Sequence, residues 1–93
     1  MASATASHIL TDSKDKCDDL KKQIEEGAEF EEIAKTHSLC PSGNKGGDLG
    51  EFNPGAMVPE FDKVVFSEEI GAVHGPIKTQ FGYHLIKITS RTD

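Results

Sequence analysis

The stretch SLCPSGNKGGDLGEF, residues 38–52, joins a predicted helix to a predicted strand. It gathers a cysteine, a Pro-Ser-Gly turn and four of the chain's nine glycines within fifteen residues. Residues 48–52 alternate as a short strand does, although glycine inside a strand weakens it. Folding alone would not require this composition, and no other part of the chain is explained so poorly by folding. We therefore expect the remaining elements to form a scaffold around it.

Two helices are predicted directly before this stretch. Between residues 13 and 26 apolar side chains recur at Cys17, Leu20 and Ile24, a spacing that places them on one helical stripe. Gly27 can end this helix. The second helix has apolar or partly apolar residues at i, i+3, i+4 and i+7, which are Phe30, Ile33, Ala34 and His37.

Two shorter elements lie further out. Residues 7–10 have the composition of a short strand, whereas residues 1–5 are small and polar and are expected to fray. Pro59 suits the first turn of a helix, and residues 58–66 then form a short helix with Phe61 on its apolar face.

A β-hairpin is predicted at the end of the chain. Residues 77–79 and 83–89 read as strands, and a three-residue loop with a glycine joins them. The last strand is apolar on both faces, which is typical of a central strand and places His84 inside. Strand, two helices, strand, helix and hairpin together predict an α+β fold with a small sheet.

Size and composition limit the possible functions. Ninety-three residues make one domain, 1–93, with a modest core. The 10 Lys and Arg against 16 Asp and Glu give a net charge of -6, so nucleic acid is a poor partner. No apolar run approaches the roughly 20 residues of a membrane span. Two cysteines in no metal-binding spacing and no visible signal peptide predict reduced thiols and a cytoplasmic location, and we expect a monomer.

His8 and His84 are the first candidates for chemistry. They lie in the first and last predicted strands, so their imidazoles can meet if these strands are neighbours. The simpler interpretation is two unrelated core histidines with satisfied ring nitrogens. A buried histidine needs a partner for each nitrogen, and Thr79 and Ser38 are candidates.

Cys40 has three interpretations. As a nucleophile it would need a base, such as one of the histidines, and backbone N–H groups from the glycine loop. As a zinc ligand it lacks compact spacing to other ligands. As a small buried thiol it needs no function.

Several apolar residues lie at or beside the loops that flank the glycine-rich stretch. Core filling is the first explanation for each of them. As a set they could instead line a shallow apolar cup in which methionine supplies adaptable shape. The residues are Leu49, Phe52, Met57 and Phe61.

Five motifs in the same order resemble the parvulin family of peptidyl-prolyl cis/trans isomerases, especially its small single-domain prokaryotic-like members. The resemblance covers residues 5–91. The motifs are SHIL at 7–10, GAEF at 27–30 with AKTHSLCPSG at 34–43, GGDLGEF at 46–52, MVPEF at 57–61 and TQFGYH at 79–84.

This resemblance implies a four-stranded antiparallel sheet surrounded by about four helices, of the parvulin/FKBP-like type. It also implies roles for residues. Catalytic positions would be His8, Cys40, Thr79 and His84. Leu49, Met57 and Phe61 would hold the substrate proline, with Phe52 at the edge and Gln80 and Ser38 beside the polar network.

The expected function is rotation of X-Pro peptide bonds in flexible proline-containing polypeptides, which assists folding without a cofactor or a metal. Residues 11–16 contain no arginine and are charge-balanced, so a preference for phosphorylated residues before proline is not expected. A module that binds proline segments with little catalysis is the main alternative. A thiol hydrolase that uses Cys40 is the third.

Overall fold

The computed structural model describes residues 3–39 and 41–92 of the chain. Four strands, three α-helices and one short 3-10 helix follow one another in this part of the chain. In chain order they are β1 (Ser3–Thr11), α1 (Lys14–Glu25), α2 (Phe30–His37), η1 (Pro41–Lys45), β2 (Asp48–Phe52), α3 (Pro59–Ser67), β3 (Val73–Thr79) and β4 (Gly82–Thr92).

The strands form one antiparallel sheet in the order β2-β1-β4-β3. The first and last strands of the chain are therefore central neighbours. The predicted central position of the last strand is confirmed, as is the α+β class with a four-stranded antiparallel sheet. Among the described helices, none is long and apolar enough to cross a membrane.

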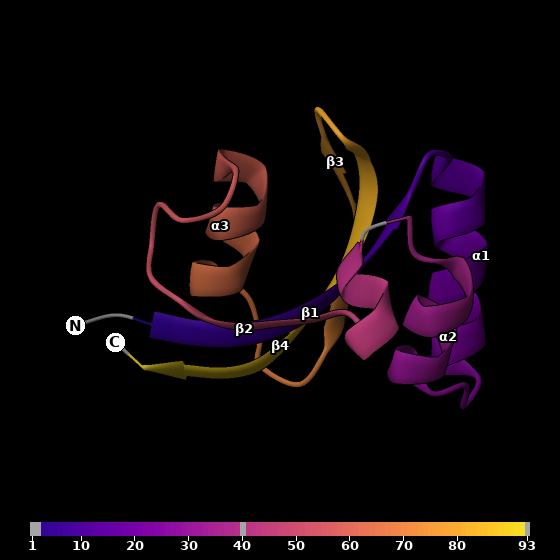
Figure 1. Ribbon diagram of the computed structural model, residues 1–93, viewed down its shortest axis with the longest axis horizontal. Helices are drawn as coiled ribbons and strands as arrows, with labels where there is room; N and C mark the ends of the chain where they lie inside the picture. The colour runs from indigo at the N-terminus through magenta and orange to yellow at the C-terminus, as the bar shows by residue number, and fades with distance from the viewer. Residues whose placement is uncertain (1–2, 40, 93) are drawn as a thin grey trace.

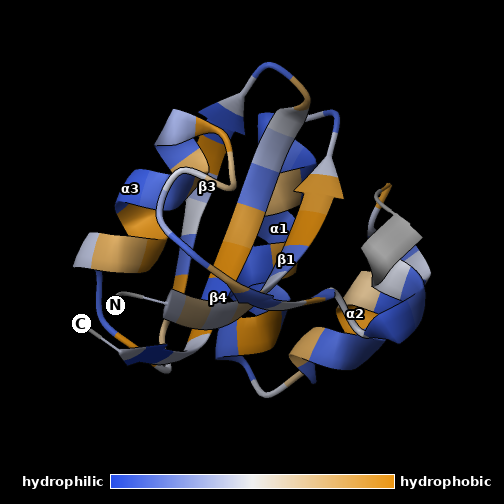
Figure 2. Cartoon of the chain, turned by 60° about the vertical axis from the view of Figure 1, so that its left-hand side comes forward, coloured by the Kyte–Doolittle hydropathy of each residue, from blue (hydrophilic) through white to orange (hydrophobic). Residues whose placement is uncertain are grey.

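Helices cover both faces of the sheet. Figure 1 shows α1 and α2 on one side and α3 on the other. Hydrophobic residues of β1 and β4 lie in the middle of the molecule, between these layers (Figure 2). The α1/α2-side core contains Ile9, Cys17, Leu20, Phe30, Ile33, Ala34 and Leu85. The α3-side core contains Ala4, Ala6, Phe52, Phe61, Val65, Ile86 and Ile88.

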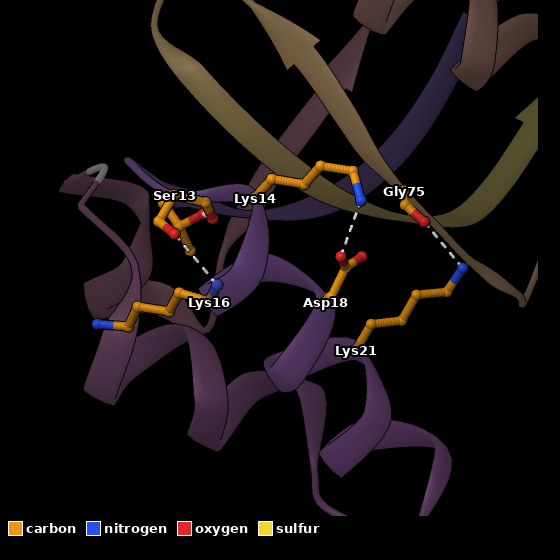
Figure 3. A network of polar contacts seen from close by, with 7 residues as sticks. Ser13, Lys14, Lys16, Asp18, Lys21 and Gly75 are labelled. Carbon is orange, nitrogen blue, oxygen red and sulfur yellow. Dashed lines mark hydrogen bonds and ion pairs between the residues drawn. The ribbon is translucent and has the colours of Figure 1, made fainter.

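Polar contacts fix α1 to its surroundings (Figure 3). The Ser13 hydroxyl accepts a hydrogen bond from the backbone N–H of Lys16 at 3.4 Å and so caps the first turn. Lys14 and Asp18 form an exposed ion pair one turn apart. The ammonium group of Lys21 donates to the carbonyl of Gly75 at 2.9 Å. The last contact joins α1 to the edge strand β3.

The start of the chain is more ordered than its sequence predicts. Residues 3–5 belong to β1, so the expectation that residues 1–5 fray is wrong for these three, whereas residues 1 and 2 lie outside the described part. Ala4 is buried and pairs with Phe52 on one side and Arg91 on the other. The hydroxyl of Thr5 lies 2.6 Å from that of Thr89 on β4. These small residues thus form a strand because β2 and β4 pair with them on either side.

Two loops also differ from the sequence-based expectation. A 3-10 helix, Pro41–Lys45, occupies part of the glycine-rich stretch. The hairpin loop has two residues instead of three, because Thr79 pairs directly with Gly82. Gly82 has a φ of 138°, and a Cβ on it would lie 2.3 Å from the carbonyl oxygen of Thr11. The glycine is therefore required where the hairpin passes close to β1.

Candidate active site

His8 and His84 lie side by side on β1 and β4. Their Nδ1 atoms are 3.1 Å apart, and the rings are nearly parallel, with centroids separated by 5.2 Å. Both side chains are buried, with 6% and 4% of their surface exposed. Strand pairing accounts for this meeting, since Leu10 is opposite His84 and Ile86 is opposite His8. The two ends of the chain thus combine in one polar pair.

Thr79 extends this pair into a chain of three side chains. Its hydroxyl oxygen lies 2.7 Å from Nε2 of His84 and accepts a hydrogen bond from the backbone N–H of Phe81 at 3.2 Å. Only one proton can occupy the space between the two Nδ1 atoms. The contacts therefore favour two neutral imidazole rings over two charged ones.

The electrostatics of the pair favour the same state. Burial, followed by the charge that His84 would carry, lowers the pKa of His8 from 6.5 to about 4. Burial also lowers the pKa of His84. At neutral pH the two rings form a surface that is polar but uncharged.

Phe61 stands against both imidazoles. Its ring is edge-on to His8, with centroids 5.6 Å apart, and to His84, with centroids 6.0 Å apart. Phe52 packs behind it at 6.2 Å. Pro59 at the first turn of α3 fixes the start of the helix that carries Phe61. This aromatic packing holds one wall of the site.

A pocket of about 400 Å³ opens above the histidine pair. Its lining is apolar except for the two imidazoles. Three predicted proline contacts, Leu49, Met57 and Phe61, are among the lining residues. The full lining is His8, Leu10, Leu39, Leu49, Met57, Val58, Phe61, Phe81 and His84.

Other predicted site residues lie next to the pocket without lining it. Phe52 is buried behind Phe61 in the α3-side core. The hydroxyl of Ser38 accepts a hydrogen bond from the backbone N–H of Leu10 at 3.1 Å, and Gln80 is exposed in the hairpin turn. Cys40 lies outside the described residues.

Four lining residues were not predicted: Leu10, Leu39, Val58 and Phe81. All four lie within two positions of a predicted site residue in sequence. Leu39 and Phe81 are isolated apolar residues in loops, which carry no periodic signal. Their exposure is what would have identified them, and it becomes visible only in the folded chain.

The glycine-rich stretch touches the site through Gly47. Its carbonyl accepts a hydrogen bond from the N–H of His8 at 2.9 Å. Gly47 has a φ of 86°, and a Cβ at this position would lie 2.4 Å from the carbonyl oxygen of His8. Only glycine permits this close approach. The stretch therefore supports the backbone of one of the two histidines.

Within the described part of the chain, no three His, Cys, Asp or Glu side chains come close enough to hold a metal ion. The pocket offers apolar walls and a neutral imidazole pair, and the buried Thr79 hydroxyl lies behind His84. Such a site suits a small apolar ring attached to a polar group.

The fold and this pocket are those of a known family of domains. The family described as "Rotamase: PPIC-type PPIASE domain" matches residues 4–90, and the chain belongs to this family of parvulin-type peptidyl-prolyl isomerase domains. The resemblance seen in the sequence motifs is thereby confirmed.

Individual relatives agree. The chain is 48% identical over 90 residues to the foldase protein PrsA of Exiguobacterium sibiricum, covering 95% of this chain but 30% of that protein. The crystal structure of PrsA from Bacillus anthracis matches with a TM-score of 0.95 and 42% identity, over 99% of this chain and 43% of that one. NmPin, the parvulin of Nitrosopumilus maritimus, matches with a TM-score of 0.86 and 34% identity, over 97% of this chain and 98% of that one. The chain thus spans less than a third of the curated foldase and nearly all of NmPin.

Proposed function

We propose that the chain is a peptidyl-prolyl cis/trans isomerase that accelerates rotation of X-Pro bonds in flexible segments of other polypeptides and so assists folding. The observation that carries this proposal is the apolar pocket closed by the uncharged His8–His84 pair. In this proposal Leu49, Met57 and Phe61 grip the pyrrolidine ring. His8, Cys40, Thr79 and His84 form the polar floor.

The pocket can lower the barrier without making a bond. Rotation about an amide requires loss of its C–N double-bond character, which costs roughly 18 to 20 kcal/mol. The planar amide has the larger dipole, whereas the twisted amide has a less polar carbonyl and a more pyramidal nitrogen. An apolar site with a neutral floor therefore binds the twisted form better than the planar one. Each 1.36 kcal/mol of this preference gives about a tenfold rate.

The proposed mechanism gives Cys40 no covalent role. Attack on an amide would risk hydrolysis, and isomerisation needs no bond to break. We expect Cys40→Ser and Cys40→Asp to retain substantial activity on an X-Pro peptide. Complete loss of activity in a variant that remains folded would favour a nucleophilic thiol.

Two-dimensional NMR exchange on an Ala-Pro peptide tests the activity directly. Wild-type protein in catalytic amounts should produce cis–trans exchange peaks that are absent from the peptide alone. Met57→Ala should reduce kcat/KM by about tenfold, because a half-buried pocket side chain is lost. Ile70→Ala is the matched control, since Ile70 is 43% exposed and lies outside the pocket lining. Equal loss in both variants would contradict the pocket assignment.

A binding module with little catalysis is the second candidate. The names foldase and chaperone carried by relatives favour it, because neither name requires isomerisation. In that case peptides would shift the NMR signals of Met57 and Phe61 without producing exchange peaks.

We also propose a cytoplasmic monomer. Cys17 is a buried free thiol whose pKa burial raises to about 11, which is compatible with a reducing compartment. Light scattering on the purified chain would measure its mass in solution. Fractionation of cells that express the native gene would test the location.

A further inference from the structure

We infer that Asp62 is a positioning residue for the pocket, because its carboxylate holds the loop that presents Met57 to the substrate. The inference rests on the proposed isomerase function and deepens it, since Asp62 lies outside the pocket lining and acts on that lining through another residue. The segment concerned is the β2–α3 loop, residues 53–58.

The β2–α3 loop contributes two residues to the pocket although most of it is exposed. Met57 and Val58 line the pocket and are half-buried, whereas residues 53–56 before them are exposed. In Figure 1 the loop leaves the sheet after β2 and passes along α3 before the helix begins. Because an exposed segment buries little apolar surface, its hydrogen bonds largely decide where Met57 lies.

The loop begins with a tight turn that leaves one N–H group available. The N–H of Ala56 donates to the carbonyl of Asn53 at 3.2 Å, and Pro54 and Gly55 lie between them. Gly55 has a φ of 90°, as the third residue of a type II turn requires. The hydrogen bond of the turn does not use the N–H of Gly55, which can therefore bind another acceptor.

Asp62 supplies this acceptor and binds the chain on both sides of Met57. Its Oδ1 accepts a hydrogen bond from the N–H of Gly55 at 3.0 Å. Its own backbone N–H donates to the carbonyl of Val58, the N-cap of α3, at 2.9 Å. A carboxylate is a stronger acceptor than a neutral group. One residue thus fixes the chain directly before and directly after the segment that carries Met57.

Asp62 is itself held on a fixed element. It lies near the start of α3, between the buried residues Phe61 and Val65, and the positive end of the helix dipole favours its charge. Glu60 carries the same charge in the same turn and is exposed. Within the described part of the chain, the carboxylate of Asp62 and not that of Glu60 is bonded to the loop. Glu60 therefore provides a matched control for the charge.

Loss of this hydrogen bond should weaken substrate binding more than it slows rotation. The pyrrolidine ring that Met57 grips is present in the planar and the twisted amide alike, so a mobile loop must be ordered in either case. A uniform loss of binding raises KM and leaves kcat nearly unchanged. General destabilisation acts differently, because fewer active molecules lower the apparent kcat and leave KM unchanged.

Exchange rates of an Ala-Pro peptide, measured by NMR over a range of peptide concentrations, give KM and kcat for each variant. Asp62→Ala should raise KM by about three- to fivefold and keep kcat within about 1.5-fold of the wild type. Asp62→Asn keeps an acceptor oxygen and should restore most of the wild-type KM. Glu60→Ala should leave KM unchanged. An unchanged KM in Asp62→Ala, or an equal rise in Glu60→Ala, would overturn the inference.

A double-mutant cycle shows whether Asp62 acts through Met57. In the Met57→Ala background, Asp62→Ala should change KM by less than about 1.5-fold, since the side chain that it positions is gone. A full effect of Asp62→Ala in that background would mean that Asp62 acts elsewhere, and the inference would be wrong.

Measurements without turnover separate this inference from the proposed function. The methyl signal of Met57 should shift and its order parameter should fall in Asp62→Ala but not in Glu60→Ala. Titration with the Ala-Pro peptide should show weaker binding in Asp62→Ala alone of these two variants. Absence of exchange with the wild-type protein would refute the proposed function, whereas the affinities and the Met57 signal would still decide the inference.

Discussion

Two buried imidazoles make the stability of this protein depend on pH. The pKa of His8 falls to about 4 in the folded chain, mainly through burial, and that of His84 is lowered in the same direction. A proton therefore binds the unfolded chain more readily than the folded one. Stability from these groups is fully present above pH 6.5 and is lost as the pH falls toward 4. His8 alone should account for on the order of 2 to 3 kcal/mol.

Urea unfolding at pH 7, 6, 5 and 4 measures this effect. Carboxyl groups also titrate near the lower end, so the comparison is made with His8→Gln at each pH. The variant should be less stable than the wild type at pH 7, and the difference should shrink as the pH falls. A difference that stays constant from pH 7 to 4 would show that His8 is not the titrating group.

Gly47 provides a second prediction at the scale of one residue. Gly47→Ala adds a Cβ that would lie 2.4 Å from the carbonyl oxygen of His8, so β1 or the loop must move. Gly55→Ala is a matched control, because its φ of 90° is close to the 86° of Gly47 and nothing lies within 4 Å of the added Cβ. The control should lose about 1 kcal/mol for the positive φ alone. Gly47→Ala should lose a further 1 to 3 kcal/mol or so from overpacking.

The free energies of unfolding of Gly47→Ala and Gly55→Ala measure whether the close contact with His8 adds to the destabilisation. NMR shifts of the His8 and His84 ring protons should move in Gly47→Ala and stay in place in Gly55→Ala. Equal destabilisation without ring shifts would mean that the glycine at 47 serves the turn only and does not support the histidine.

At the scale of elements, α3 depends on an anchor from the far end of β4. The guanidinium of Arg91 donates to the carbonyls of Val65 and Glu68 at 2.8 and 2.7 Å. These carbonyls lie at the C-terminal end of α3, where a cation is favourable. The same helix carries Phe61 at its other end. Arg91 therefore helps to hold the wall of the pocket from a distance.

Arg91→Met should destabilise the protein by about 1 to 2 kcal/mol, because two carbonyls lose a charged donor. Hydrogen exchange should accelerate in α3 more than in α1. Arg91→Lys should restore part of the protection, while Lys63→Met on the exposed face of α3 should change little. Uniform acceleration across the whole chain would indicate a global effect in place of a local anchor.

Helices and strands in which apolar residues recur at regular spacing were predictable from the sequence. Cys17 and Leu20 mark the buried stripe of α1. The successive residues Leu85 and Ile86 are both buried, on opposite faces of β4, and so mark it as a strand covered on both faces. The first strand was predicted too short, because Ser3 and Thr5 are polar and their hydroxyl partners on β4 are invisible in a local pattern. The 3-10 helix after Cys40 has no apolar period at all.

The site residues also fall into those that the sequence pattern predicts and those that it does not. The meeting of His8 and His84 required only that the first and last strands be neighbours, and the fold makes them so. Leu39 and Phe81 escaped prediction because a loop residue acquires its role from the segments that approach it in space. Ser38 was predicted to lie beside the network, and its hydroxyl accepts a hydrogen bond from the backbone N–H of Leu10, two residues after His8.

At the scale of the whole molecule, the two cores share the same two strands. The α3-side core and the α1/α2-side core lie on opposite faces of β1 and β4, and successive residues Leu85 and Ile86 enter one core each. If either layer of helices unfolded alone, one apolar face of β1 and β4 would be exposed to water. We therefore propose that the described chain unfolds as one domain in a single cooperative step.

Urea titration followed by methyl NMR tests this cooperativity, with Ile9 as the probe of the α1/α2-side core and Ile88 as the probe of the α3-side core. Both methyl signals should give the same midpoint and the same slope, about 1 to 1.5 kcal/mol per molar urea for a chain of this size. Ile88→Val should lower both midpoints together by an amount that corresponds to about 1 kcal/mol. Because the pocket is assembled from β1, β4 and α3, peptide binding at saturating concentration should raise both midpoints as well. Separate midpoints for the two probes would show that the layers unfold independently, and binding would then raise only the midpoint of Ile88.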